Sequence, residues 1–201
     1  MLITSQNQLR ALYGWPSGRA KDKVLSELEE HSKYFIECSP FFVLSTYGMS
    51  GKTDASPRGG VPGFVKILDS RTLLIPDAKG NNRVDSLVNI VETGNIGALF
   101  MIPGIDETLR INGTAEISTD NNYLNLFKAE KRPPVACIKI NISGVFLHCA
   151  KALMRSSIWG NVNRMSRPEF PTMGKMLNDQ LKTDRPLESQ EEMIKRYQKD
   201  L

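Results

Sequence analysis

Cysteine and histidine are scarce in this sequence. Its 201 residues contain three cysteines, Cys38, Cys137 and Cys149, which are odd in number, far apart and in no CxxC pattern. Such thiols are typical of a reduced, cytoplasmic protein rather than of a disulfide-bonded secreted one. The two histidines, His31 and His148, leave little from which to build a histidine-based metal site or a Ser-His-Asp triad. We therefore expect neither a metal centre nor a triad hydrolase.

Several functional signatures are also missing. No GxGxxG follows a strand pattern, and no P-loop or HExxH occurs, so Rossmann, nucleotide-triphosphate and zincin chemistry have no support. No run of about 18 apolar residues is present to span a membrane, and the N-terminus lacks the pattern of a secretory signal. The net charge of +4 comes without a basic run, so the sequence favours a small anionic ligand over nucleic acid.

The chain has ample material for one globular domain, since 40% of its residues are hydrophobic. Apolar residues spaced three and four apart predict a helix over residues 21–37. Short turns between successive apolar runs favour a mainly β fold with peripheral helices (α+β), built as an antiparallel barrel or sandwich. Two polar segments at 171–181 and 188–201 are expected to form terminal helices that pack on the surface or on a partner subunit. Strands are predicted at 41–47, 63–68, 72–76, 95–102, 108–118, 135–142 and 145–149, and further helices at 84–90 and 121–130.

The segment IPDAKGNNRVDSL, residues 75–87, places a cation where a helix begins. Asn82 is expected to cap that helix, and Asp85, three residues on, to complete a variant capping box. Arg83 would then lie in the first turn, where the helix dipole disfavours a positive charge. A bound phosphate would reverse that sign, because the turn would offer it backbone N–H groups, two amides and a guanidinium. The alternative is an ordinary capped helix with a solvated arginine.

The segment DASPRGGVPGF, residues 54–64, holds Arg58 between Pro57 and two glycines. So much proline and glycine predicts a stiff irregular loop rather than the interior of a regular strand. Such a frame would aim Arg58 at another group, and an arginine suits bidentate contact with a phosphate. A plain surface loop explains the same residues equally well.

One face of the strand predicted at 108–118 is polar. Thr108, Arg110 and Asn112 share that face, because side chains two apart along a strand point the same way. The three side chains are candidates for lining a ligand groove. The alternative is a strand surface that faces solvent.

A further group of candidates follows the last predicted strand. Lys151, Arg155 and Trp159 are spaced four apart, so a helix there would stack them along one side. They would form either a cationic lid with an aromatic cap or an interface stripe. His148 and Cys149 are neighbours in a strand, so their side chains point to opposite faces and do not share a metal. His148 is therefore expected to be structural.

Five short stretches, in this order, carry a family resemblance. They are SPRG, IPD, GNNR-x-DSL, PG-x-DETLR-x-NG and HCAKA, spread over roughly residues 30–160. With them the chain resembles the pyridoxamine 5′-phosphate oxidase-like family of FMN-binding split β-barrels, in a subfamily distinct from the true pyridoxamine phosphate oxidases. The resemblance implies a six-stranded antiparallel split β-barrel that forms a homodimer with FMN at the subunit interface.

The resemblance also implies which residues hold the cofactor. No side chain stands out as an acid–base catalyst, which is consistent with a flavin that carries the chemistry itself. Lys151, Arg155 and Trp159 are assigned to the substrate side. The residues assigned to the FMN phosphate are Arg58 with its neighbour Gly59, and Asn81, Asn82 and Arg83; those assigned to the flavin ring or ribityl chain are Ile75, Pro76, Asp77, Thr108 and Arg110.

The function implied is that of an FMN-dependent oxidoreductase, with NAD(P)H or another small molecule as electron donor. The alternative is a non-catalytic FMN-binding carrier, sensor or electron relay. The triplet at 81–83 is less basic than in the true pyridoxamine phosphate oxidases, and the ending with which they grip the substrate's phosphate is missing, so the substrate stays open. The expected organisation is an N-terminal extension at 1–20, an FMN-binding split-barrel domain at 21–160 and a C-terminal helical tail at 161–201.

Overall fold

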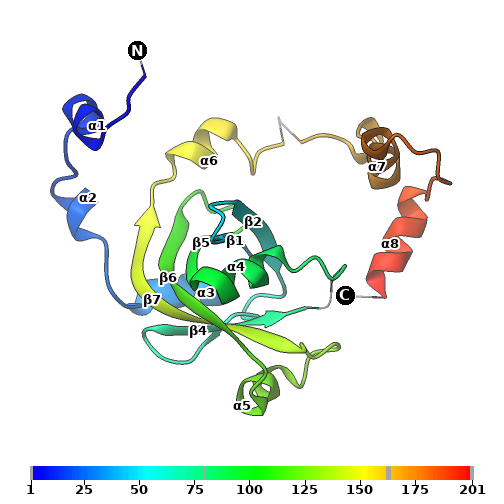
Figure 1. Ribbon diagram of the computed structural model, residues 1–201, viewed down its shortest axis with the longest axis horizontal. Helices are drawn as coiled ribbons and strands as arrows, with labels where there is room; N and C mark the ends of the chain where they lie inside the picture. The colour runs from blue at the N-terminus through cyan, green and yellow to red at the C-terminus, as the bar shows by residue number, and fades with distance from the viewer. Residues whose placement is uncertain (1, 79, 162–163, 200–201) are drawn as a thin grey trace.

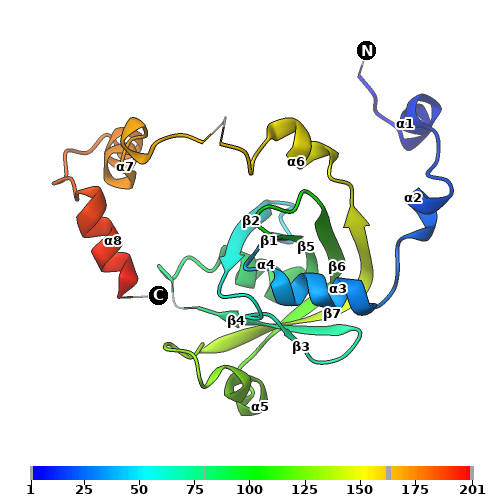
Figure 2. The same cartoon turned by 180° about the vertical axis from the view of Figure 1, so that it is seen from behind.

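The computed structural model describes residues 2–78, 80–161 and 164–199. Its centre is one antiparallel sheet of seven strands in the order β2-β1-β5-β6-β7-β4-β3. Figures 1 and 2 show this sheet curling into an incomplete barrel, with α3 and α4 against it and the terminal helices outside. The strands are β1 (Phe41–Tyr47), β2 (Thr53–Gly59), β3 (Lys66–Ile67), β4 (Thr72–Asp77), β5 (Asn95–Met101), β6 (Thr108–Ser118) and β7 (Ala136–His148). The helices are α1 (Gln6–Tyr13), α2 (Arg19–Asp22), α3 (Glu30–Cys38), α4 (Asp85–Thr93), α5 (Asn121–Leu124), α6 (Lys151–Ser156), α7 (Met173–Leu181) and α8 (Gln190–Gln198), with 3-10 turns η1 (Asn125–Phe127) and η2 (Arg167–Glu169).

The apolar faces of the strands enclose the core. In β1, Phe42 and Leu44 are fully buried, whereas Ser45 faces outward. The ring of Phe42 stacks on that of Phe100 in β5, with the two centroids 4.7 Å apart. A period of two is the pattern from which these strands were predicted, and β6 has the predicted bounds. The mainly β fold with peripheral helices is confirmed.

The segment that the sequence assigned to an irregular loop is partly a strand. β2 pairs with β1 along its whole length, so the prediction for 54–64 was wrong in its first half. Proline is tolerated because β2 lies at the edge of the sheet. Gly60 donates its N–H to the carbonyl of Pro40 at 3.0 Å, and hydrogen-bonded pairs alternate from there along the ladder. The nitrogen of Pro57 therefore points away from β1, where no N–H is needed.

The helix predicted over 21–37 exists only in part. α3 begins at Glu30, and α2 is a single turn. Between them Leu25 exchanges two backbone hydrogen bonds with Val145 of β7, of 2.9 and 2.8 Å. The carboxylate of Glu29 accepts from two N–H groups in the first turn of α3 and so caps that helix. The prediction was therefore wrong for the segment between α2 and α3, where a sheet contact and an N-cap interrupt the helix.

The two strands predicted within 135–149 form the single strand β7. Its ladder with β6 shifts by one residue after Asn112, which leaves Ser143 as the extra residue of a β-bulge. The two backbones approach closely there: a Cβ added to Gly113 would lie 2.1 Å from the carbonyl oxygen of Asn141. A bulge of this kind bends a strand without ending it. The alternation of apolar and polar residues is therefore interrupted at Ser143, although the strand continues.

The sheet differs in strand number from the barrel that the resemblance implied. The described residues form seven strands rather than six, and β2 and β3 remain free edges, so the barrel is not closed by hydrogen bonds. β3 keeps only two residues of the strand predicted at 63–68, because Phe64 and Val65 turn into the core. The helix predicted at 121–130 is likewise reduced to α5 and η1.

The terminal helices lie outside the barrel. α7 and α8 fall within the predicted tail segments, and each begins with a side-chain cap, from Thr172 and Ser189. Figures 1 and 2 show them set apart from the sheet, and neither helix contains a buried residue. No helix in the described ranges is long and apolar enough to cross a membrane. The division of the chain near residues 20 and 160 stays a prediction.

Candidate functional site

One pocket of about 360 Å³ gathers most of the residues assigned to the FMN phosphate. It lies between β2, the end of β4 and the loop that leads into α4, and we call it the arginine–amide pocket. Arg58, Asp77, Asn81, Asn82 and Arg83 all line it, whereas the rest of its lining is mostly small or apolar. The fold therefore brings together side chains that the sequence presents in three separate places.

Arg58 is held in this pocket by an ion pair. Its Nη1 donates to Oδ1 of Asp77 at 2.8 Å, which ties β2 at one end of the sheet to β4 near the other. The two side chains are only 18% and 16% exposed, so water screens the pair weakly. Nε of Arg58 is buried and has no hydrogen-bond partner among the described residues. Because an unpaired buried donor costs free energy, a ligand oxygen would be favourable at this position.

The loop before α4 differs from the expected capping box. α4 begins at Asp85, its N-cap is Val84, and no side chain caps it. Asn82 instead adopts a left-handed backbone conformation with φ of 61°. The side chain of Asn81 accepts a hydrogen bond from the N–H of Arg83 at 3.0 Å. The prediction of Asn82 as the N-cap was therefore wrong: the two asparagines build a turn, which their short polar side chains favour.

Arg83 lies just before α4 rather than in its first turn. Its Nε donates to Oδ2 of Asp85 at 2.8 Å, and this hydrogen bond raises the pKa of Arg83. The side chains are 78% and 55% exposed, so the pair contributes little to folding. The conflict between Arg83 and the helix dipole is thus relieved by a neighbouring carboxylate, without any ligand.

Three other residues assigned to FMN do not line the arginine–amide pocket. Ile75 is fully buried in the barrel core, so its side chain does not reach a surface ligand. Pro76 is half-buried beside Asp77 at the end of β4. Gly59 ends β2 close to the backbone of Pro40, whose carbonyl oxygen would lie 3.4 Å from an added Cβ. The roles of these residues at a cofactor stay predictions.

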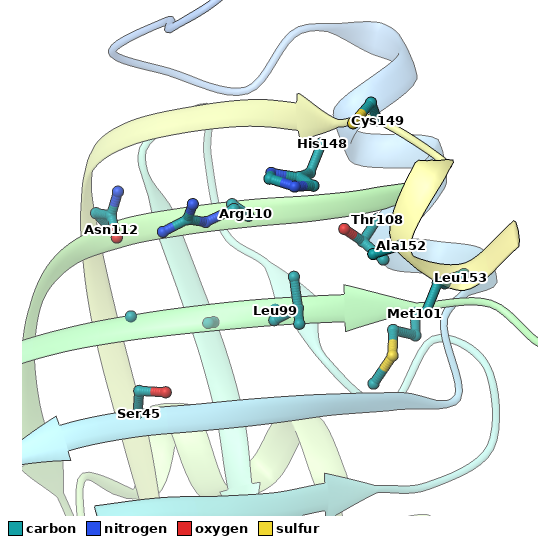
Figure 3. A pocket seen from close by; sticks show the side chains of 12 residues that line it. Ser45, Leu99, Met101, Thr108, Arg110, Asn112, His148, Cys149, Ala152 and Leu153 are labelled. Carbon is teal, nitrogen blue, oxygen red and sulfur yellow. The ribbon is translucent and has the colours of Figure 1, made fainter. Parts of the chain in front are cut away.

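A second pocket, of about 510 Å³, contains Thr108 and Arg110. It lies on the outer face of β1, β5, β6 and β7 beside α6, and we call it the outer pocket. Figure 3 shows Arg110 and His148 projecting into it from neighbouring strands, with Leu99 on the next strand. The guanidinium of Arg110 lies 5.0 Å from the centroid of the Phe146 ring. The residues that were assigned to one cofactor are therefore divided between two pockets.

Among the described residues that line the outer pocket, none carries a carboxylate. Arg110 adds a positive charge, and the hydroxyl, amide and imidazole groups beside it can donate or accept hydrogen bonds, so the lining suits an anionic or polar ligand. His148, expected to be structural, lines this pocket, and Leu99 and Met101 supply apolar surface that the sequence reasoning did not assign to any site. The available signal was the strand predicted at 95–102, which is apolar on both faces although its outer face is not covered.

The stripe predicted after β7 does not form. α6 ends at Ser156, and Ser157 follows in a left-handed conformation with φ of 47°. Trp159 is therefore outside the helix, where its indole N–H donates to the carbonyl of Ile105 at 3.0 Å. The stacking of Lys151, Arg155 and Trp159 on one helix was a wrong prediction. The α6 residues that line the outer pocket are Ala152 and Leu153, so Lys151 and Arg155 do not contribute to its lining.

A third pocket, of about 460 Å³, adjoins the arginine–amide pocket, and Arg83 lines both. Three carboxylates line it, those of Asp54, Asp85 and Glu92, beside the ammonium of Lys52, and we call it the acidic pocket. Asp54 accepts a hydrogen bond from the hydroxyl of Ser86. Despite these carboxylates, no group of three or more potential ligands in the described part of the chain is arranged to hold a metal ion.

A comparison with models of protein families shows to which family this chain belongs. The family model described as pyridoxamine 5′-phosphate oxidase matches residues 28–149, which is more than half of the chain and includes all seven strands. The chain belongs to this family. The resemblance that the five sequence motifs carried is thereby confirmed.

One of three similar solved structures agrees with that membership at the level of the fold. HupZ of Group A Streptococcus is 18% identical, with a TM-score of 0.50 over 60% of this chain and 93% of that one. A putative pyridoxamine 5′-phosphate oxidase of Lactobacillus delbrueckii is 21% identical, with a TM-score of 0.47 over 61% and 95%. An FMN-binding protein of Syntrophomonas wolfei is 12% identical, with a TM-score of 0.43 over 58% and 88%. Of these three, HupZ alone reaches a TM-score that shows a shared fold, and it shows the fold only. No curated protein matches the chain.

The family match also separates the candidate residues into two groups. The residues named above from the arginine–amide and acidic pockets lie within 28–149, as do all but the α6 residues of the outer pocket. Lys151, Arg155, Trp159 and the tail helices lie beyond the matched region. The match therefore covers the barrel and most of the residues that line its pockets, whereas α6 and the tail lie outside it.

Proposed function

We propose that this protein is an FMN-dependent oxidoreductase that acts on an unidentified small molecule. The observation that carries the proposal is the arginine–amide pocket, in which two arginines and two asparagines from separate segments converge. A terminal phosphate dianion suits such a site, because one guanidinium can donate to two phosphate oxygens at once and the amides donate further hydrogen bonds. Membership of the pyridoxamine 5′-phosphate oxidase family supports a flavin as the cofactor.

The residues of the pocket fit a phosphate in both charge and donors. Arg58 offers a buried Nε without a partner among the described residues, and no side chain caps the first N–H groups of α4. Arg58 would hold the phosphate from β2, and Asn81, Asn82 and Arg83 would hold it from the loop. FMN, when bound, supplies the exchange of hydride or electrons, while the protein binds and orients it.

We further propose that two copies of the chain form a homodimer with FMN between them. The outer pocket is open on the outer face of the barrel wall, and its apolar part, which includes Leu99, Met101 and Leu153, is a surface that a second subunit could cover. Thr108 and Arg110 would then contact the flavin or the substrate from this face. NAD(P)H or another small molecule is the proposed electron donor.

A visible absorption spectrum of the purified protein tests the proposal. Bands of oxidised flavin that NADH or NADPH bleaches and air restores would support an oxidoreductase. Release of the bound flavin and its analysis by mass spectrometry would identify it as FMN. A protein that neither retains FMN nor binds it when it is added would refute the proposal.

The alternative is a non-catalytic FMN-binding carrier, sensor or electron relay. One observation favours it: the residues that converge on the arginine–amide pocket are arginines and asparagines suited to holding an anion, which a carrier or sensor needs as much as an enzyme does. A flavin spectrum that reductants and small-molecule substrates leave unchanged would support this alternative over turnover.

A further inference from the structure

Arg83 lies between two pockets of opposite character. On one side, the arginine–amide pocket offers two amides and the guanidinium of Arg58. On the other side, the acidic pocket contains the carboxylates of Asp54, Asp85 and Glu92, which outnumber its one lysine, Lys52. The guanidinium of Arg83 bonds to the acidic side, with 2.8 Å between its Nε and Oδ2 of Asp85. It makes no other hydrogen bond with the described residues, and the carboxylate of Asp54 attracts it only through space.

The two arginines of the arginine–amide pocket are paired in different ways. The Arg58–Asp77 pair joins two strands and is shielded from water, with side chains 18% and 16% exposed. The Arg83–Asp85 pair forms within one short segment, and its side chains are 78% and 55% exposed. An exposed pair of this kind exchanges its partner at low cost, whereas a shielded one does not. Arg83 is therefore the arginine that is free to change partner.

Of the carboxylates in the acidic pocket, Asp85 is the one committed to Arg83. Asp54 accepts a hydrogen bond from the Ser86 hydroxyl, and Oε2 of Glu92 accepts one from the N–H of Met49 at 2.9 Å. The side chain of Asp85 has Arg83 as its partner among the described residues.

We infer that Asp85 competes with the phosphate of the ligand for Arg83, and so sets how strongly the site prefers a phosphorylated flavin to an unphosphorylated one. The inference rests on the proposed function, since the phosphate is that of FMN. Two effects of Asp85 both weaken the binding of the phosphate. Arg83 gives up or shares its bond to Asp85 when the phosphate binds, and the carboxylate repels the dianion through space. Asp85 is thus a specificity-determining residue that restrains affinity.

The substitution Asp85→Asn tests this directly, because asparagine keeps an oxygen that accepts from Arg83 and removes only the charge. Dissociation constants for FMN and riboflavin are measured by quenching of flavin fluorescence. We expect FMN to bind roughly two- to fivefold more tightly to Asp85→Asn than to the wild type, because the loss of an exposed ion pair changes an equilibrium by about this factor. Riboflavin should bind to both proteins equally well. The matched control is Asp179→Asn, which removes an exposed carboxylate paired with Lys175 at 2.7 Å in α7. It should change neither constant.

A double-mutant cycle shows whether the effect passes through Arg83. In an Arg83→Ala background, the gain from Asp85→Asn should shrink to the small part due to repulsion alone. If the ratio of the FMN and riboflavin dissociation constants is the same in Asp85→Asn as in the wild type, the inference is overturned and the proposed function is left intact. Weaker FMN binding to Asp85→Asn would also overturn it, because Asp85 would then orient Arg83 for the phosphate. A wild-type protein that binds no FMN would refute the proposed function and this inference with it.

Discussion

Replacing Asp77 with alanine should loosen the barrel where its sheet is open. The Arg58–Asp77 ion pair, 2.8 Å long, is a direct side-chain link between β2 and β4, which no backbone ladder joins. Asp77→Ala would leave the guanidinium of Arg58, 18% exposed, without its carboxylate and with its Nε already unpartnered. Removing one partner of a fully buried pair costs about 3–5 kcal/mol, and an exposed pair contributes about 0–1 kcal/mol. For this mostly shielded pair we expect a loss of about 2 kcal/mol in the free energy of unfolding.

Urea denaturation followed by circular dichroism measures this loss. For a chain of this size, about 2 kcal/mol corresponds to a fall in Tm of roughly 4–8 °C. The double variant Arg58→Met/Asp77→Ala should recover part of the stability, because the uncompensated charge is removed together with its partner. Arg83→Ala, which breaks an exposed pair instead, serves as the control and should leave the free energy of unfolding unchanged. An Asp77→Ala protein as stable as the wild type, or a double variant less stable than the single one, would refute this reasoning.

Three further predictions concern separate sites. Arg83→Ala should weaken the binding of FMN several-fold more than that of riboflavin, and equal losses in the two dissociation constants would show that Arg83 does not contact the phosphate. Gly113→Ala should lower the free energy of unfolding by about 2–3 kcal/mol because of its backbone clash, whereas Gly144→Ala, whose nearest neighbouring atom lies 3.8 Å from the added Cβ, should cost much less in the same urea titration. Burial raises the pKa of the Cys137 thiol from 9.0 to about 11, so the unfolded chain ionises first and stability should fall as pH rises through that window. A Cys137→Ala variant should lose this slope in a plot of Tm against pH, and an unchanged slope would assign it to other groups.

The barrel was predictable wherever one face of a strand is buried. The alternation in β1 and β6 follows directly from a wall with core on one side, so their bounds could be read from the sequence. β2 could not be predicted, because Pro57 and the glycines after it are compatible with a strand only at an edge, and the order of strands is a property of the whole fold. The single strand β7 was missed for a related reason, since a bulge at Ser143 interrupts the pattern without ending the ladder.

The sequence grouped four of the candidate residues correctly on one pocket, but it did not predict their pairings. The convergence of Arg58, Asn81, Asn82 and Arg83 on one pocket agrees with the grouping that the family resemblance implied. The partner of Arg58 is Asp77, 19 residues away, and only the curl of the sheet brings the two together. The capping of α4 was misjudged because an asparagine suits both an N-cap and a left-handed turn, and Asn82 takes the left-handed turn here.

The outward-facing nitrogen of Pro57 restricts how copies of this chain can assemble. An edge strand with a full row of N–H groups is a template on which a neighbouring chain can continue the ladder, and such growth has no natural end. β2 is an edge that lacks one of these donors at its centre. Side-by-side extension of the sheet through β2 would therefore leave one carbonyl of every added ladder without its N–H partner, which disfavours open-ended growth through this edge.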